Sequence, residues 1–480
     1  MTEAAARGAP PKEARANPVR ELGPGFRGAV LRPGDEGYDA ARRIWNGAID
    51  KRPALIARCT GAPDVLSAVR AARERGVLTA VRGGGHNVAG TATCNGGLVI
   101  DLSPMKGMHV DPVRRTARAE PGLLWGEFDH ETQAFGLAAP GGIVTHTGVA
   151  GLTLGGGIGW LMRKHGLTCD NLLSADVATA DGRLVTASDE EHSDLFWGVR
   201  GGGGNFGIVT SFEFRLHPVG PTVLAGVVLY TDEQTRDALR FYRDFAAGAP
   251  DELTTIVALR HAPALPFIPE RLHGAPVLSI AACYAGPIGD GERVLAPLRA
   301  FGPPAVDAIR PMQYTAHQAM FDATVPHGLH YYWKSHDLPG LSDDTIDVML
   351  GHGWAAQSRR SYTILFQLGG AIARTAENAT AYGGRTAQYS VNINAVCESA
   401  VGFEAEVAWT RRFSEALRPL STGGVYVNFL GDEGEDRVRA AYGEDRYARL
   451  VALKTAYDPT NFFCLNQNIK PRGPSPLRSP

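Results

Sequence analysis

The N-terminal part of the chain alternates short apolar runs with an amphipathic stretch. The run A-L-I-A-R-C at residues 54–59 is typical of a buried strand. Over residues 63–76 apolar positions recur with helical spacing, and Gly76 is a residue type that commonly ends a helix. Apolar runs at residues 78–82 and 97–102 predict two further strands. This succession predicts a fold that mixes helices and strands.

The pattern over residues 171–217 predicts a hairpin, a helix and a long strand. Residues 171–187 place two apolar runs on either side of Ala-Asp-Gly, a turn sequence favoured in hairpins. A helix is expected over residues 188–200, with Ser188 or Asp189 as its N-cap, because either side chain can accept a hydrogen bond from the first turn. The run I-V-T-S-F-E-F-R-L then predicts a strand.

The character of the chain changes after His217-Pro218. The following two hundred or so residues carry amphipathic stretches mixed with strands such as S-Y-T-I-L-F-Q-L and A-Q-Y-S-V-N-I-N-A-V. We therefore place a domain boundary near residue 218, between a first domain at 27–218 and a second at 219–430. Residues 1–26 carry no such pattern and are expected to form a disordered tail.

Composition and charge narrow the class of protein. With 44% hydrophobic and 20% charged residues the chain is typical of an ordinary globular protein, and a net charge of −2 gives it no general attraction for nucleic acid or an acidic membrane. No apolar window reaches about 18 residues, so no transmembrane helix is expected, and the N-terminus lacks the apolar region of a secretory signal. The six cysteines are widely spaced without a C-x-x-C pair. This spacing argues against a disulfide framework or a metal site, and a cytoplasmic protein is expected.

Three glycine clusters carry the chemistry. They are V-R-G-G-G-H-N-V-A-G at residues 81–90, G-V-A-G-L-T-L-G-G-G-I-G-W at 148–160, and R-G-G-G-G-N-F-G at 200–207. A lone cluster is most often a tight turn. Three clusters within about 125 residues favour backbone packed against one large ligand. Successive bare N–H groups bind anions, so a dinucleotide with a pyrophosphate suits them.

The third cluster also satisfies a second, weaker motif. Gly202, Gly204 and Gly207 match G-x-G-x-x-G, the fingerprint of a Rossmann nucleotide site. That site needs a strand before the glycines, a helix after them, and an acid about 20 residues further on. Here a helix precedes, a strand follows, and no acid lies near position 222. The Rossmann interpretation therefore fails on context.

Four stretches, in this order, resemble the signatures of the FAD-linked oxidases of the vanillyl-alcohol-oxidase (PCMH-type) superfamily, berberine-bridge-enzyme-like branch. They are R-G-G-G-H-N-V-A-G, G-V-A-G-L-T-L-G-G-G-I-G-W, D-L-F-W-G-V-R-G-G-G-G-N-F-G-I-V-T and Y-D-P-T-N-F-F-C-L-N-Q-N-I. The match spans about residues 45 to 470. It implies an α+β fold of two domains: a PCMH-type FAD-binding domain at 27–218, completed by a returning C-terminal segment at 431–480, and a substrate domain at 219–430 formed by an antiparallel sheet covered by helices.

The resemblance gives the histidine of the first cluster a specific role. In the family this histidine bonds covalently to the 8α-methyl group of the flavin, and the position here is His86. A neutral imidazole nitrogen is a competent nucleophile near neutral pH. Without the surrounding motifs, a solvent-facing loop histidine would be the simpler interpretation. Many relatives carry a second attachment through a cysteine. The matching position here is Val144, which cannot bond the flavin, so the FAD is expected to be monocovalent. The nearby His146 is interpreted as part of the wall.

Further cofactor contacts follow from the same motifs. Two side chains, Asn466 and Asn468, are expected to hydrogen-bond the pyrimidine edge of the flavin, with turn capping as the alternative. Cys464 occupies a place where relatives often have arginine, so a local contact is expected to differ. The remaining expected contacts are Gly83, Gly84, Gly85, Asn87, Gly122, Gly148, Gly151, Gly155, Gly156, Gly159, Gly207, Ile208 and Val209.

Substrate chemistry is less clear from the sequence. Tyr426 matches a stretch where relatives often place a catalytic tyrosine, which would take a substrate proton if its pKa were lowered; packing in a strand is the alternative. The stretch H-G-L-H-Y-Y-W-K-S-H at residues 327–336 is a candidate pocket wall for a ring-bearing substrate. Candidate substrate contacts on predicted strands, which outward-facing polar positions explain equally well, are Gln367, Asn392, Asn394 and Asn428.

The function implied is a two-electron oxidation of a small-molecule alcohol, sugar or secondary metabolite. Hydride passes to flavin N5, and molecular oxygen then takes the electrons as hydrogen peroxide. Two alternatives stay open: a dehydrogenase of the same fold with another acceptor, and a flavin- or nucleotide-binding protein without turnover. The protein is expected to be a monomer or homodimer.

Overall fold

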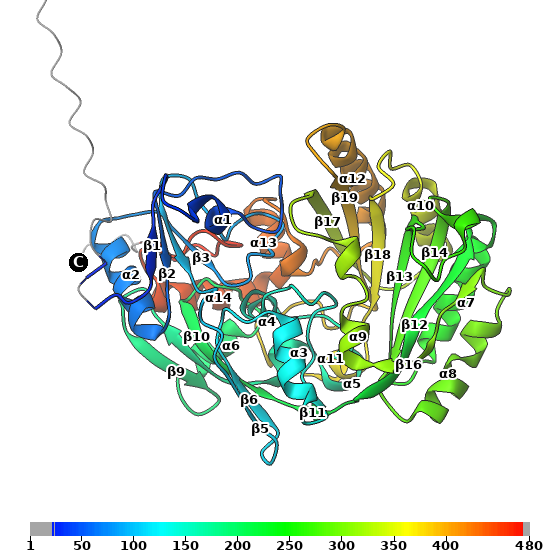
Figure 1. Ribbon diagram of the computed structural model, residues 1–480, viewed down its shortest axis with the longest axis horizontal. Coiled ribbons are helices and arrows are strands. Elements are labelled where there is room, and N and C mark those ends of the chain that lie inside the picture. Colours follow the sequence, from blue (N-terminus) through cyan, green and yellow to red (C-terminus); the bar gives the residue numbers. More distant parts are fainter. Residues whose placement is uncertain (1–21, 24, 474–480) are drawn as a thin grey trace, which may run out of the picture.

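The computed structural model describes residues 22–23 and 25–473, and Figure 1 shows two sheet-based halves side by side. In the first half, a four-stranded sheet has the order β1-β2-β4-β3. The strands are β1 (Ala29–Leu31), β2 (Leu55–Arg58), β3 (Thr79–Arg82) and β4 (Leu98–Asp101). Both β2 and β3 run parallel to β4. Parallel neighbours need a crossover, which the predicted helix supplies as α2 (Ala62–Glu74).

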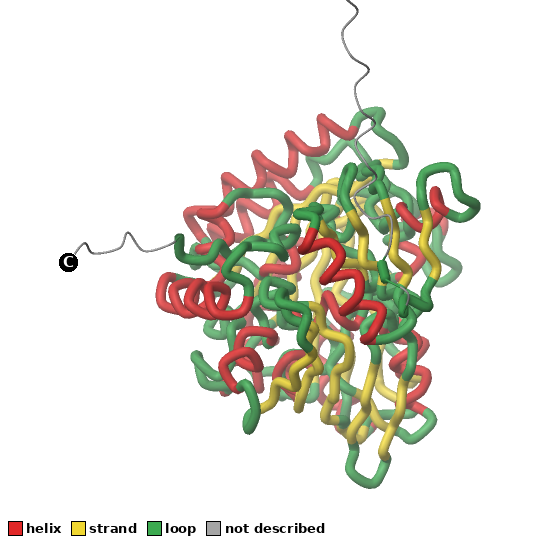
Figure 2. Tube along the Cα trace, turned by 90° about the vertical axis from the view of Figure 1, so that its left-hand side faces the viewer, coloured by secondary structure: helices red, strands yellow, loops and turns green. Residues whose placement is uncertain are grey.

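The second sheet of this half is antiparallel and contains the predicted hairpin. Its order is β5-β6-β10-β8-β9. The strands are β5 (Met108–Asp111), β6 (Thr116–Ala119), β8 (Leu172–Ala178), β9 (Leu184–Ser188) and β10 (Ile208–Arg215). The helices packed with it include α3 (Trp125–Gln133), α6 (Ser193–Val199) and α14 (Glu444–Tyr457). Figure 2, which looks onto this half, shows strands through the middle with helices on both sides.

The predicted start of α6 was wrong. The helix begins at Ser193, and His192 precedes it in a left-handed conformation with no side-chain cap. Ser188 instead accepts hydrogen bonds through its hydroxyl from the N–H groups of Glu190 and Glu191. The serine side chain therefore closes a turn of its own before the helix, as serine often does outside helices.

The second half is one large antiparallel sheet of eight strands. Its order is β15-β12-β14-β13-β18-β19-β17, with β16 also paired to β12. Helices cover one face, as expected, and the other face looks toward the first half (Figure 1). The strands are β12 (Thr222–Thr231), β13 (Leu253–His261), β14 (Pro276–Tyr284), β15 (Val306–Asp307), β16 (Arg310–Gln313), β17 (His330–Leu338), β18 (Tyr362–Gln367) and β19 (Tyr389–Cys397). The covering helices are α7 (Asp232–Ala247), α8 (Ile288–Ala300), α10 (Asp343–Gly353) and α12 (Phe403–Leu417).

Together these sheets confirm the predicted α+β class. Among the described residues, no helix is both long and apolar enough to cross a membrane. Most of the tail predicted at residues 1–26 lies outside the described residues, although Leu22 and Phe26 already pack against the core of the first sheet. Short elements complete the description: β7 (Leu137–Ala138), β11 (His217–Pro218), α1 (Tyr38–Arg42), α4 (Val149–Leu154), α5 (Met162–His165), α9 (Tyr314–Gln318), α11 (Ala371–Arg374), α13 (Glu435–Tyr442), and 3-10 turns at Thr168–Asn171, Glu270–Leu272, Asp322–Thr324, Arg418–Leu420 and Val427–Phe429.

The end of the chain returns to the first half. In Figure 1, α13 and α14 lie among the elements of that half, although they follow the whole large sheet in the sequence. Leu450 and Leu453 of α14 share a buried core with Phe196 of α6. The buried Lys454 ammonium donates to the backbone carbonyls of Asn205 and Phe463, which ties the C-terminal segment to the third glycine cluster.

The two halves also meet at a buried carboxyl group. Asp129 of α3 is 1% exposed, and its Oδ2 accepts a hydrogen bond from the amide of Gln318 in α9, at 2.7 Å. Its Oδ1 has no partner among the described residues. Burial raises the pKa of Asp129 from 3.8 to about 7, because a charge there loses its hydration.

This raised pKa predicts that Asp129→Asn stabilises the folded protein by an amount that depends on pH. The folded state holds the proton more tightly than the unfolded chain, so wild-type stability falls as pH rises from about 4 to 7. Asparagine cannot ionise and still accepts from Gln318. The variant should gain up to about 4 kcal/mol over wild type at pH 8, and the gain should vanish near pH 4. Urea unfolding at both pH values measures it; an equal difference at the two would contradict the assignment.

Candidate active site

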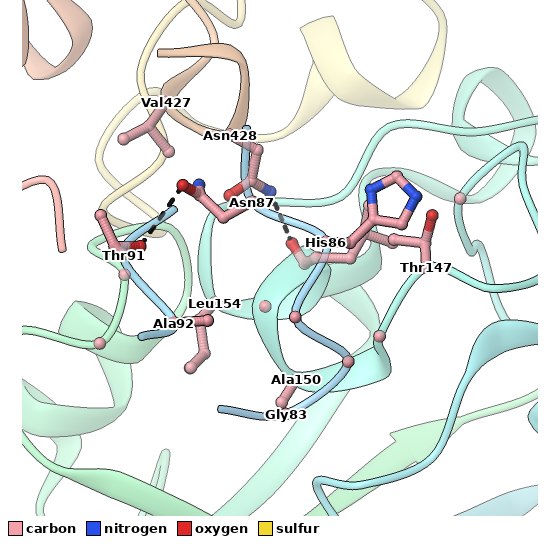
Figure 3. A pocket seen from close by; sticks show the side chains of 18 of the residues that line it. Gly83, His86, Asn87, Thr91, Ala92, Thr147, Ala150, Leu154, Val427 and Asn428 are labelled. Atoms are coloured by element: carbon pink, nitrogen blue, oxygen red, sulfur yellow. Dashed lines mark hydrogen bonds between the residues drawn. The ribbon is translucent and has the colours of Figure 1, made fainter. Parts of the chain in front are cut away.

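A cavity of about 310 Å³ lies between the two halves. The first half contributes the glycine clusters, the second contributes β17, β18 and β19, and the C-terminal segment contributes Phe463, Leu465, Asn466 and Gln467. Figure 3 shows His86, Thr147 and Asn428 projecting around it from three separate segments. No Asp, Glu, Lys or Arg side chain lines it among the described residues.

The first glycine cluster leaves β3 and packs directly against the second. A Cβ atom on Gly84 would lie 2.5 Å from the Cα of Gly148, and one on Gly148 would lie 2.7 Å from the Cα of Gly84. Two backbones touch here, and only glycine fits on either side. Gly85 adds a φ of +67°, which turns the chain so that His86 follows at the cavity wall.

The glycines in and around the cavity are of two kinds: those that face its open space and those that pack against other parts of the protein. At Gly151 and Gly204, which line it, a Cβ would meet no protein atom within 4 Å, so the bare backbone there faces open space. A pyrophosphate or ring system could approach these positions closely. Of the predicted cofactor contacts, those that line the cavity are Gly83, Gly84, Gly85, His86, Asn87, Gly148, Gly151, Gly207, Ile208, Val209 and Asn466.

The second kind has a different cause from the one expected. Their missing side chains make room for other parts of the protein. A Cβ added to Gly159 would lie 1.6 Å from the carbonyl oxygen of Gly141, and a Cβ added to Gly155 would lie 2.1 Å from the amide oxygen of Asn428. The expected contacts that do not line the cavity are Gly122, Gly155, Gly156, Gly159 and Asn468. Asn466 lines it with a buried Oδ1 that has no partner among the described residues, while Cys464 does not line it.

His86 is held flat at the cavity wall. Its ring stacks on Trp45 with centroids 4.3 Å apart and planes 15° apart, and Trp45 stacks in turn on Tyr331. Burial lowers the pKa of His86 well below 6.5, and the nearby His146 and His327 lower it further. The imidazole is therefore neutral at physiological pH, which leaves a nitrogen lone pair available for bonding. Val144 is 8% exposed and lines the same cavity.

The substrate-domain wall follows the alternation of the strands. Tyr362, Ile364 and Phe366 of β18 line the cavity, as do Asn392 and Asn394 of β19. Asn392 has a buried Oδ1 with no partner among the described residues. The two asparagines are thus brought together with the glycine clusters, as expected, although they are buried and not outward-facing.

Gln367 does not join them. Leu365, two positions earlier on the same strand, packs with the helices on the far face of the sheet. Because alternate residues of a strand point to the same side, Gln367 lies on that face too. Its side chain accepts from the hydroxyl of Thr255 and donates to the carbonyl oxygen of Ala246 in α7. Its role as a substrate contact is therefore a correction: the polar group serves a strand-to-helix contact.

Tyr426 and Asn428 line the cavity from a 3-10 turn, Val427–Phe429, and not from a strand. The Tyr426 hydroxyl accepts from the backbone N–H of Gly157 at 2.9 Å and from the Asn428 amide at 2.8 Å. Burial raises the pKa of Tyr426 above its usual range, so the phenol is protonated. This shift is opposite to the lowering that a resting base requires.

Several wall residues were not predicted individually. Trp333, from the aromatic stretch at residues 327–336, lines the cavity with a buried indole N–H that has no partner among the described residues. Tyr362 and Phe366 alternate along a predicted strand, which was the available signal for them. Trp45 and Phe429 reach the cavity through tertiary contacts that leave no local pattern.

A cavity with bare backbone on one wall and aromatic and amide side chains on the other is consistent with a flavin-dependent oxidoreductase of the PCMH type. Comparison with known proteins agrees. Residues 53–188 match the FAD binding domain family, and residues 425–470 match the berberine and berberine-like family. The chain belongs to the berberine-bridge-enzyme-like FAD-linked oxidoreductases.

Individual relatives cover nearly the whole chain. An FAD-linked oxidoreductase of Dictyostelium discoideum is 32% identical over 94% of this chain and 97% of its own. The (R)-6-hydroxynicotine oxidase of Paenarthrobacter nicotinovorans is 31% identical over 93% and 98%. The crystal structure of 6-hydroxy-D-nicotine oxidase from Arthrobacter nicotinovorans superimposes with a TM-score of 0.85 at 31% identity, covering 95% of this chain and 100% of that one.

Proposed function

We propose that this protein holds FAD through one covalent bond to His86 and uses it to oxidise a small molecule, with molecular oxygen as electron acceptor. The observation that carries the proposal is a neutral, stacked imidazole at the end of the bare glycine loop, inside the cavity that the substrate domain closes. Val144 lines the same cavity and cannot bond a flavin, so His86 is the single point of attachment.

The remaining cofactor contacts would be made mainly by backbone. At the open positions Gly151 and Gly204 no described protein atom lies within 4 Å of where a Cβ would stand, so the pyrophosphate and the extended chain of FAD could approach the backbone there. The unpartnered Oδ1 of Asn466 supplies a hydrogen-bond acceptor for the ring edge of the flavin. The bound flavin would supply the acceptor for a hydride.

The opposite wall would orient the substrate. Trp333, Tyr362 and Phe366 offer flat apolar surface, while Asn392 and the indole N–H of Trp333 offer one acceptor and one donor without partners. These groups suit a small molecule with a ring and a hydroxyl or amine group. Relatives include an oxidase of 6-hydroxynicotine and an oxidase of xylooligosaccharides. An alcohol, a sugar or a ring-bearing secondary metabolite is the substrate class proposed here.

The oxygen acceptor is tested by separating the two halves of the reaction. A panel of alcohols, sugars, amines and polyketides is screened for loss of flavin colour under argon, and air is then admitted. The proposal expects rapid return of the colour with one hydrogen peroxide formed per substrate oxidised. A flavin that stays reduced in air but returns with an artificial dye would make the protein a dehydrogenase. A flavin that no compound reduces would favour binding without turnover.

Tyr426→Phe is expected to slow flavin reduction by about 100-fold or more, because proton handling by a positioned side chain contributes at least that much. We assign the hydroxyl to the substrate's oxygen or nitrogen, to which the neutral phenol donates a hydrogen bond. It would take the substrate proton only as the phenolate, once the bound cofactor has lowered its pKa. The variant also leaves the N–H of Gly157 unpaired, which should cost about 1–3 kcal/mol of stability. Stopped-flow reduction and urea unfolding measure the two effects.

The matched control is Tyr382→Phe. Tyr382 is a buried neighbour whose ring centroid lies 6.1 Å from that of Tyr426, and it does not line the cavity. Its variant should reduce the flavin at the wild-type rate. If Tyr426→Phe also does so, the hydroxyl only supports the turn at Gly157.

A further inference from the structure

Three histidines form a row that leads from the cavity wall to the surface. The Nε2 of His86 lies 3.1 Å from the Nδ1 of His146, a hydrogen-bond distance. The ring centroid of His146 lies 4.9 Å from that of His327. The three come from separate segments: the glycine loop, the loop before α4, and the loop before β17. His86 and His146 are half-buried, whereas His327 is exposed.

The surroundings of the row disfavour a resting positive charge. Burial lowers the pKa of all three histidines, and neighbouring histidines lower the pKa of His86 and His146 further. Two other charges face the row: Arg82 lowers the pKa of His327 further, and Asp322 raises that of His146 in part. The carboxylate of Asp322 accepts hydrogen bonds from the N–H and hydroxyl of Thr145. A proton is therefore disfavoured most strongly on His86, and the nearby Asp322 carboxylate favours it on His146.

The hydrogen bond between His86 and His146 is not needed to hold the ring in place, because packing already fixes it. Trp45 holds the plane of His86 by stacking. When Nε2 of His86 donates its hydrogen to Nδ1 of His146, Nδ1 of His86 keeps its lone pair for the flavin. His146 must then carry its own hydrogen on Nε2, which is buried and has no protein partner among the described residues.

We propose that His146 accepts the imidazole proton of His86 as His86 bonds to FAD, and that the proton then leaves to solvent past the exposed His327. The proposal rests on the covalent attachment proposed above. Attachment forms one N–C bond and removes one hydrogen from the imidazole nitrogen and one from the 8α carbon. Two protons leave, and the two electrons stay on the flavin until molecular oxygen takes them as hydrogen peroxide. The row carries the imidazole proton only.

His146→Ala is expected to slow covalent attachment by about 100-fold, the lower end for loss of a general base. Flavin-free protein from riboflavin-limited cells is mixed with FAD, and the flavin fluorescence of acid-denatured protein in a gel gives the attached fraction over time. Added imidazole should restore much of the rate, because it can occupy the vacated space and accept the proton. The rate should also rise with pH in the variant but stay flat between pH 7.5 and 8.5 in wild type, because a pKa below 6.5 leaves His146 neutral there.

Further variants separate a proton acceptor from a packing residue. His146→Gln keeps a polar side chain that cannot relay a proton and should attach as slowly as His146→Ala; His327→Gln should be slowed less, because solvent can replace the last member. The control His330→Gln alters a histidine that packs on Phe403 outside the row and should attach like wild type. Equilibrium binding of FAD before attachment should be unchanged in all of them.

Two outcomes overturn different claims. If His146→Gln attaches FAD at the wild-type rate, or if imidazole fails to accelerate His146→Ala, the relay is wrong while the bond to His86 stands. If His86→Ala retains covalent flavin, the attachment itself is wrong and the relay falls with it.

Discussion

His86→Ala should carry FAD that washes into the supernatant when the protein is precipitated with acid, whereas the wild-type pellet should stay yellow. Alanine has no nucleophile, and the side chain of Val144, which lines the same cavity, has none either. The backbone contacts at the glycine clusters are untouched, so FAD should still bind and colour the native protein. The measurement is the ratio of flavin in pellet and supernatant, expected to fall from nearly all attached to none.

Loss of His86 also removes a stacking partner of Trp45, so folding needs a separate check. The melting temperature of each variant provides this check. A second variant, His86→Gln, restores some of the lost side-chain volume. The control His130→Ala changes an exposed histidine of α3 and should keep its flavin in the pellet. Yellow pellets from both His86 variants would exclude His86 as the attachment point. Substrate oxidation should be slower in the variants, because an untethered ring is less well fixed against the substrate.

Gly84→Ala should nearly abolish FAD binding and also destabilise the flavin-free protein. The new Cβ would lie 2.5 Å from the Cα of Gly148 and 2.6 Å from its nitrogen, which are backbone atoms that cannot rotate away. Forcing the two loops apart costs about 1–3 kcal/mol by the usual scale of overpacking, and it moves both glycine walls of the cavity together. Urea unfolding without flavin measures the first effect, and titration with FAD measures the second.

Gly351→Ala serves as a matched control with the opposite sign. Gly351 lies in helix α10, exposed, with no atom within 4 Å of an added Cβ. Alanine there should stabilise the protein by about 0.5–1 kcal/mol, because it restricts the unfolded chain and favours the helix. A Gly84→Ala protein that unfolds like wild type and binds FAD normally would show that the loops are not in contact.

Most of the positions predicted to contact the cofactor line the cavity, and they could be recognised in the sequence because that wall is built from backbone. A glycine cluster ending in histidine is local, so the loop at Gly83–His86 could be recognised without knowing the fold. The same signal misled at Gly155 and Gly159, since a glycine needed for close approach of a ligand looks identical to one needed for close approach of Gly141 or the Asn428 side chain. Only the three-dimensional arrangement separates the two causes.

The substrate wall was harder for a related reason. Strand alternation predicts that every second residue shares a face, but it does not say which face meets the cavity. Asn392 and Gln367 are both buried polar residues on neighbouring strands, and they lie on opposite faces. Trp45 could not be found at all, because its partner His86 is distant in the sequence and the stacking is purely tertiary.

The return of the C-terminal segment has a consequence for synthesis. The cavity needs both Asn87 and Asn466, which are about 380 residues apart in the sequence. A ribosome adding about 5–20 residues per second takes roughly 20–75 s to reach the second wall after making the first. During that time the glycine loop is complete, but the part of the cavity wall formed by the C-terminal segment is missing. Flavin capture is therefore a late event in the life of the nascent chain, and a covalent bond formed then would make that late step irreversible.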